Sequence, residues 1–141
     1  MKRIIFLLSI SLALLACDKT DPINDPFNEL VGTWQLTEVL ADPGDGSGVY
    51  RPFSSQKMIT FAADGTYTST GLLCSLNPSD ETRTGGTYNL EDSSLIATNC
   101  HFGASEEAVP IPFEIRDGAL FLSFPCIEPC GEKYQKITAF D

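Results

Sequence analysis

Hydrophobic and polar residues alternate in short runs along most of this 141-residue chain, a pattern typical of β-strands separated by turns. The clearest alternation sets Val109, Ile111, Phe113 and Ile115 on one face. About eight strands are predicted in this way: Thr33–Leu40, Gln56–Phe61, Thr66–Thr70, Gly86–Leu90, Ser94–Asn99, Val109–Ile115, Ala119–Phe124 and Lys133–Thr138.

Two prolines, Pro110 and Pro112, fall on the opposite face of the sixth predicted strand. Because proline cannot donate to a ladder, we expect this strand at an edge or a bulge. Short turns such as Asp64-Gly65 and Asp117-Gly118 join most neighbouring strands. This up-and-down order predicts an all-β domain that closes into an antiparallel β-barrel without free edges. A two-sheet β-sandwich is the alternative.

The start of the chain follows a different pattern. Lys2 and Arg3 precede the apolar run Ile4–Leu15, and the small residue Ala16 stands before Cys17. This order predicts a secretory signal peptide, and the apolar run is too short to span a membrane as a helix. The Leu-Leu-Ala-Cys ending resembles the lipobox of bacterial lipoproteins. That resemblance implies cleavage before Cys17, whose thiol and new amine then carry acyl chains that anchor the protein to a membrane.

Three regions are therefore expected: a signal peptide at 1–16, an anchored cysteine with a flexible tether at 17–29, and a barrel domain at 30–141. The anchor implies a place in the cell envelope, and we expect the outer membrane, on either face. Without residues 1–16 the chain has 7 basic and 19 acidic side chains, because Lys2 and Arg3 are removed. This acidic balance disfavours nucleic acid and anionic headgroups as partners.

Four further cysteines, Cys74, Cys100, Cys126 and Cys130, predict two disulfides in an exported chain. Three pairings are compatible with the sequence. We favour a local Cys126–Cys130 bridge, which leaves Cys74 with Cys100. A four-thiolate zinc site is the alternative, but the spacing fits no known zinc ribbon or finger.

The segment Leu30–Leu36, which contains Gly32 and Trp34, resembles the Gly-x-Trp opening of lipocalins and lipocalin-like domains. The resemblance implies that Gly32 and Trp34 close one end of the barrel as core residues. In lipocalins an arginine usually stacks on this tryptophan, and Lys133 or Lys136 could substitute for it. The segments Ile59–Tyr67, Gly86–Tyr88 and Glu132–Ile137 are similar to those of lipocalin-like lipoproteins of Bacteroidota.

The aromatic residues of the predicted strands suggest a function. Five of them could line an apolar pocket: Phe61, Tyr67, Tyr88, Phe113 and Phe121. Our hypothesis is a lipid-anchored binding protein of the cell envelope that holds a small apolar or amphipathic ligand in the barrel. The alternative is a filled barrel whose loops bind an envelope protein or a glycan.

The sequence contains no recognisable catalytic motif, so we expect no enzymatic activity and no cofactor. The single histidine, His101, and the adjacent pair Glu106-Glu107 fall in a polar loop without marked partners. Asp42 and Asp45 lie among glycines, as in calcium loops, but the final glutamate ligand is missing. We therefore expect no metal site.

Overall fold

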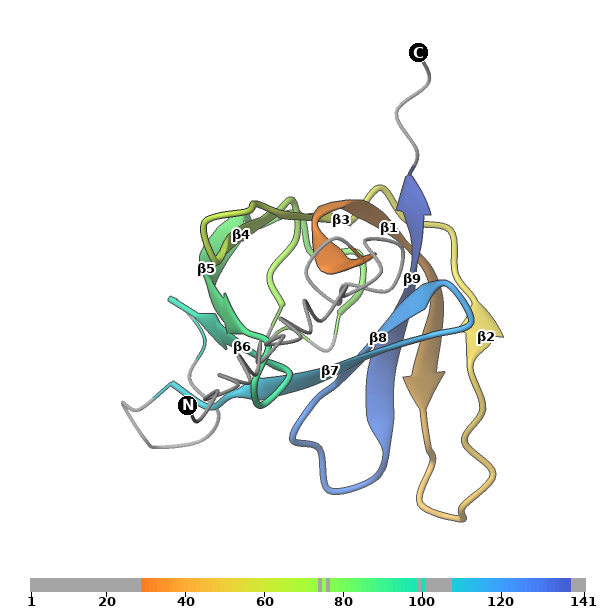
Figure 1. The fold of residues 1–141 in the computed structure, drawn as a ribbon. Helices are drawn as coiled ribbons and strands as arrows, with labels where there is room; N and C mark the ends of the chain where they lie inside the picture. The colour runs from red at the N-terminus through yellow and green to blue at the C-terminus, as the bar shows by residue number, and fades with distance from the viewer. Residues whose placement is uncertain (1–28, 74, 76, 99, 101–107, 138–141) are drawn as a thin grey trace, which may run out of the picture.

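The computed structural model describes residues 29–73, 75, 77–98, 100 and 108–137. These residues form one antiparallel sheet in the order β2-β1-β3-β4-β5-β6-β7-β8-β9, and β1 also pairs with β9. The sheet therefore closes into a barrel of eight strands, to which the short β2 adds beside β1 (Figure 1). The predicted all-β antiparallel barrel is confirmed, and the two-sheet sandwich is wrong.

The strands are β1 Gly32–Ala41, β2 Arg51–Pro52, β3 Met58–Phe61, β4 Thr66–Ser69, β5 Thr84–Asn89, β6 Ser94–Ala97, β7 Ile111–Arg116, β8 Ala119–Ser123 and β9 Cys130–Ile137. Sequence periodicity predicted all of them except β2, which has only two residues. The prediction started β9 at Lys133, whereas the strand begins at Cys130. Gly131 interrupts the alternation of hydrophobic and polar side chains at the start of this strand, because glycine has no side chain.

The expectation of an edge at Pro110 and Pro112 is wrong, because β7 lies between β6 and β8 in a closed sheet. The prolines instead coincide with a short pairing between β6 and β7. The β6–β7 ladder contains only two pairs, Ser94 with Pro112 and Leu95 with Ile111. A missing N–H donor therefore shortens a ladder here without exposing an edge.

One end of the barrel is closed by the residues around the start of β1. Trp34 is 1% exposed, and its indole Nε1 donates to the carbonyl of Leu30 at 2.8 Å. The Lys136 ammonium lies 5.3 Å from the centre of the Trp34 ring and donates to the Glu29 carbonyl at 2.6 Å. Lys136, and not Lys133, therefore stacks on the tryptophan. Gly32 has a φ of +129°, a conformation that favours glycine.

The core fills the barrel between its two ends. Its largest fully buried side chains come from β1, β3, β4, β6, β7, β8 and β9 and from the two segments that cap the barrel: Leu30, Trp34, Leu36, Ile59, Phe61, Tyr67, Leu73, Leu95, Ile111, Leu120, Leu122 and Tyr134. Every described ladder and core contact lies within residues 30–137, and residues 18–141 therefore contain all of them.

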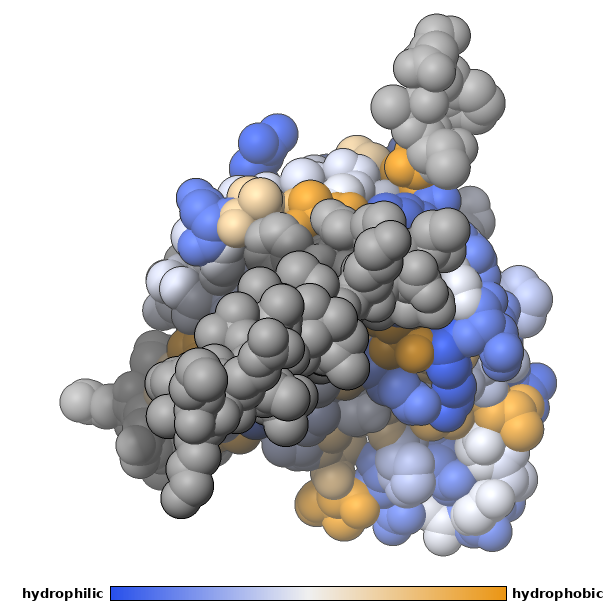
Figure 2. Space-filling model, in the orientation of Figure 1, coloured by the Kyte–Doolittle hydropathy of each residue, from blue (hydrophilic) through white to orange (hydrophobic). Residues whose placement is uncertain are grey.

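The other end of the barrel, called the mouth below, lies where β1, β4 and β8 finish and where β3, β5 and β9 begin. The β1–β2 and β8–β9 loops project side by side from this end, at the bottom of Figure 1, and Asp42 N donates to Pro129 O at 3.0 Å. Figure 2 shows hydrophobic atoms at the lower tip of the molecule, where these loops lie. Ile127 is fully exposed there. None of the described residues forms a helix long and apolar enough to cross a membrane.

Candidate functional site

Two of the five aromatic residues proposed as pocket walls, Phe61 and Tyr67, are buried in the core, with ring centres 5.9 Å apart. Tyr88 is partly exposed, packs edge-on against Phe61 at 5.4 Å and donates its hydroxyl to the Ala62 carbonyl at 2.7 Å. These three rings pack against one another toward the closed end of the barrel. They therefore do not line a pocket at the mouth.

The remaining two aromatic residues lie in different environments. Phe113 is almost fully buried and belongs to the core. Phe121 lies on the outer face, where the Arg116 guanidinium is 4.0 Å from its ring centre and the Tyr50 ring is 5.3 Å away. Its neighbours in β8, Leu120 and Leu122, are the inward side chains. Phe121 therefore does not line the interior.

A buried ion pair joins Lys57, just before β3, to Glu132 in β9, near the mouth. The Lys57 ammonium donates to both carboxylate oxygens of Glu132, at 2.8 and 3.0 Å, and to the Leu72 carbonyl at 3.2 Å. The Tyr134 hydroxyl donates to Glu132 Oε2 at 2.5 Å. Lys57 and Glu132 are each 3% exposed. All three ammonium protons are used, so the pair meets the requirement that a buried charge be fully hydrogen-bonded.

Two buried hydroxyls near this level of the barrel have no hydrogen-bond partner among the described residues: Tyr67 Oη and Thr84 Oγ1. Burial raises the pKa of the Tyr67 phenol above its ordinary value of 10.0. Burial also raises the pKa of Tyr134, and the neighbouring Glu132 carboxylate raises it further. Both phenols are therefore neutral hydrogen-bonding groups at physiological pH.

The β4–β5 loop folds inward at the mouth. Leu73 is fully buried in the core, and Leu72 accepts the Lys57 hydrogen bond. At Gly71 a Cβ would lie 2.5 Å from the Asp80 carbonyl and 2.9 Å from the Lys57 stem, so only glycine fits. The loop is thus held inward by tight packing, and it divides the space at the mouth into two parts.

The first part is an apolar space of about 210 Å³, called the mouth hollow below. It is lined by Val39, Leu40, Ala41, Ser75, Pro78, Phe124, Cys130, Gly131 and Glu132. Val39 pairs with Glu132 and Ala41 with Cys130 across the β1–β9 seam. The inner wall of the hollow is therefore built from two adjacent strands, and Glu132 is the one charged residue among the described residues that line it.

The second part is an open polar groove of about 530 Å³, called the rim groove below. It is lined by Ser54, Ser55, Gln56, Lys57, Thr70, Pro78, Ser79, Asp80, Glu81 and Arg83. Pro78 borders both spaces. The two partners of the buried ion pair are divided between them, because Lys57 lines the groove and Glu132 lines the hollow.

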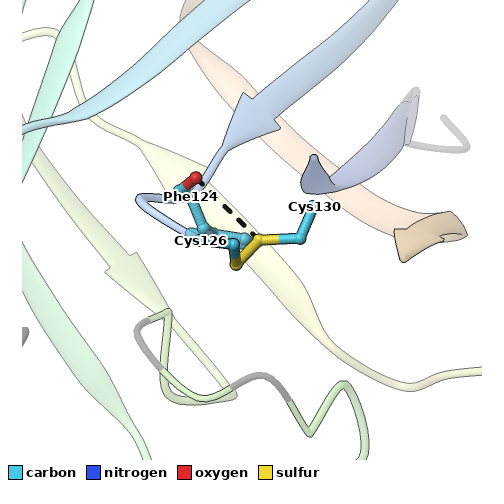
Figure 3. Close-up of a disulfide and its surroundings, with 3 residues drawn as sticks. All are labelled: Phe124, Cys126 and Cys130. Carbon is cyan, nitrogen blue, oxygen red and sulfur yellow. Dashed lines mark hydrogen bonds between the residues drawn. A yellow bond between two sulfur atoms is a disulfide. The ribbon is translucent and has the colours of Figure 1, made fainter. Parts of the chain in front are cut away.

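A disulfide braces the outer wall of the hollow. Cys126 and Cys130 are joined with a Cα–Cα distance of 6.0 Å, as predicted (Figure 3). Cys126 N donates to the Phe124 carbonyl at 2.9 Å, and Phe124 N donates to the Cys130 carbonyl at 3.2 Å. Cys100 is buried and also disulfide-bonded, while its predicted partner Cys74 lies outside the described residues.

The aspartate-rich β1–β2 loop is organised around its own carboxylate. Asp42 accepts hydrogen bonds from four backbone N–H groups, of which Gly44 and Gly48 are the closest at 2.8 Å each. The Gly48 and Gly44 N–H groups lower the pKa of Asp42. The Asp42 carboxylate therefore already accepts hydrogen bonds from the backbone of its own loop. Within the described residues no three His, Cys, Asp or Glu side chains gather as a metal site.

Other predicted positions lie outside the described residues: the signal peptide and Cys17, His101 and Glu106-Glu107. Conversely, Lys57 and Glu132 were not among the predicted site residues. Strand periodicity indicates that both side chains point inward. Lys57 is separated by an even number of positions from the inward Ile59 and Phe61, and Glu132 is two residues from the inward Tyr134. Their contact with each other, across 75 positions of the sequence, is not predictable from periodicity.

The family-model comparison matches residues 30–117 to the lipocalin-like domain, which is more than half of the chain. This agrees with the resemblance seen in the Gly-x-Trp opening and with the closed antiparallel barrel. No curated protein and no solved structure matches the chain significantly. A barrel of this kind is typical of a binding protein. The chain belongs to the lipocalin-like domain family.

Proposed function

We propose that this protein is a lipid-anchored, non-enzymatic binding protein of the cell envelope that holds a small amphipathic ligand at the barrel mouth. The single observation that carries the proposal is the mouth hollow, an apolar space of about 210 Å³ beside a polar groove. Small-molecule sites are concave and mostly apolar, with a few polar groups that fix orientation.

The position of the ligand differs from that expected from the sequence. The five aromatic candidates do not surround a common space, because four pack in or against the core and Phe121 lies outside. The ligand would instead contact Val39, Leu40 and Phe124, with its polar end toward Glu132. The anchor at Cys17 and the outer-membrane location belong to the proposal on sequence grounds alone.

Native mass spectrometry of residues 18–141, purified oxidised from periplasmic expression, tests the proposal. We expect a mass excess that disappears on denaturation. Ala41→Trp should abolish it, since Ala41 is an exposed residue that lines the hollow. Ala63→Trp is the matched control, because Ala63 is exposed in the β3–β4 turn at the closed end. Equal ligand retention by both variants would exclude the mouth hollow as the site.

A second candidate function, docking of an envelope protein, is favoured by one observation. Ile127 is 102% exposed on the loop that the Cys126–Cys130 disulfide closes, so an apolar side chain is presented on a constrained segment. A photocrosslinking amino acid at Ile127, compared with one at the half-exposed Val49, tests this in cells expressing the full chain. Identical crosslinked products at both positions would argue against specific docking through Ile127.

A further inference from the structure

The chemical class of the ligand can be narrowed by the groups that line the mouth hollow. We infer, on the basis of the function proposed above, that the hollow selects a short-chain amphiphile whose polar end is an uncharged hydrogen-bond donor, such as an alcohol or a sugar hydroxyl.

Volume limits the length of the apolar part. At roughly 30 Å³ for each water-sized group, the hollow of about 210 Å³ accommodates about seven non-hydrogen atoms. Val39, Leu40 and Phe124 provide apolar contact for such a chain. A chain of about six carbons with one polar atom fits, whereas a long acyl chain would have to extend out of the mouth.

The hydrogen bonds of the ion pair decide which head group is compatible. Lys57 uses all three of its N–H donors, on the two oxygens of Glu132 and on the Leu72 carbonyl. An anionic head in the hollow would therefore meet a carboxylate and find no free cationic donor. A carboxylate has about four lone-pair positions, and three hydrogen bonds reach Glu132 from Lys57 and Tyr134. Among the donors that the structure describes, none takes the fourth position, which would accept a hydrogen bond from the ligand.

Charge balance separates a neutral donor from a cation. Lys57 and Glu132 together carry no net charge, and Glu132 is the one charged residue that the described lining of the hollow contains. An ammonium head would lose its hydration without a net negative charge to compensate, because the Lys57 ammonium lies 2.8 Å from the same carboxylate. A hydroxyl gains the Glu132 hydrogen bond at a much smaller desolvation cost.

Three probes with the same chain test the inference: 1-hexanol, hexylammonium and hexanoate, titrated into residues 18–141 and followed by backbone amide NMR shifts near Val39 and Phe124. We expect 1-hexanol to bind at least tenfold more tightly than hexanoate and more tightly than hexylammonium. Ala41→Trp should weaken 1-hexanol at least tenfold, and Ala63→Trp should leave it unchanged.

The double variant Lys57→Met/Glu132→Leu tests the role of the carboxylate without leaving a buried charge unpaired. It should reduce the preference for 1-hexanol over hexanoate to less than threefold. Hexanoate binding as tightly as 1-hexanol would overturn the inference and leave the proposed function intact. No binding of any probe, with a mass excess still present in the native protein, would also overturn the inference alone. No binding and no mass excess would contradict both.

Discussion

The buried Lys57–Glu132 pair offers a sharp test of the barrel interior. Lys57→Met removes the ammonium and leaves the Glu132 carboxylate, 3% exposed, with Tyr134 as its one remaining described hydrogen-bond donor. The Leu72 carbonyl also loses its donor. Removing one partner of a buried pair costs about 3–5 kcal/mol, because the other charge stays buried and uncompensated.

Replacing both partners should cost much less. Exchange of a buried pair for apolar residues of similar volume is neutral or stabilising by about 1–4 kcal/mol. Lys57→Met/Glu132→Leu also leaves the buried Tyr134 hydroxyl without its acceptor and the Leu72 carbonyl without the Lys57 donor, which together cost roughly 1–3 kcal/mol. The two effects nearly cancel, so we expect the double variant within about 2 kcal/mol of the wild type.

Urea unfolding of residues 18–141, followed by the fluorescence of the single tryptophan, measures these free energies of unfolding. Glu114→Gln is the control, because its pair with Arg116 is about half exposed and should contribute less than about 1 kcal/mol. A loss below about 1 kcal/mol for Lys57→Met would refute the reasoning, since the pair would then behave as a solvated surface pair.

Three further predictions concern the closed end, the tyrosines and the local disulfide. Gly32→Ala should lower the free energy of unfolding by about 1–3 kcal/mol in urea titrations, because φ is +129° and the new Cβ would lie 2.9 Å from the Lys136 Cε; no change would contradict the conformation assigned to Gly32. Tyr67 and Tyr134 have pKa values raised by burial, so their contribution to stability should be constant below pH 10 and fall above it, where unfolded tyrosines ionise. Absorbance at 295 nm should show that these two ionise only on unfolding, and ionisation of all four tyrosines of the native protein near pH 10 would contradict this. Removing the Cys126–Cys130 bridge by two serine substitutions should cost about 2 kcal/mol in thermal unfolding and weaken ligand retention, whereas unchanged retention would show that the hollow does not need the braced loop.

Much of the fold was predictable because its determinants are local. Period-two alternation around Ile59, Tyr67 and Leu120 marks the inward face of each strand, and Asp-Gly turns set the order of neighbours. The short strand Arg51–Pro52 escaped prediction because two exposed residues carry no periodicity. The edge expected at Pro110 and Pro112 was wrong, because a sequence does not show that β7 pairs with a strand on each side, β6 and β8.

The candidate site was harder to predict, because it depends on distant pairs. Phe121 has the aromatic character of a pocket residue, yet its parity in β8 turns it to the outer face, against Arg116. Lys57 and Glu132 read as ordinary charged residues, and only the barrel brings them together. The inward course of the β4–β5 loop, which places Leu73 in the core, depends on packing at Gly71 that no local sequence pattern shows.

A crystal structure of residues 18–141, purified with the co-purifying ligand retained or saturated with 1-hexanol, tests the central claim most directly. The account predicts ligand density in the mouth hollow, in contact with Val39, Phe124 and Glu132. Density among Phe61, Tyr67 and Tyr134 in the barrel interior, or an empty mouth hollow at saturating probe, would contradict it.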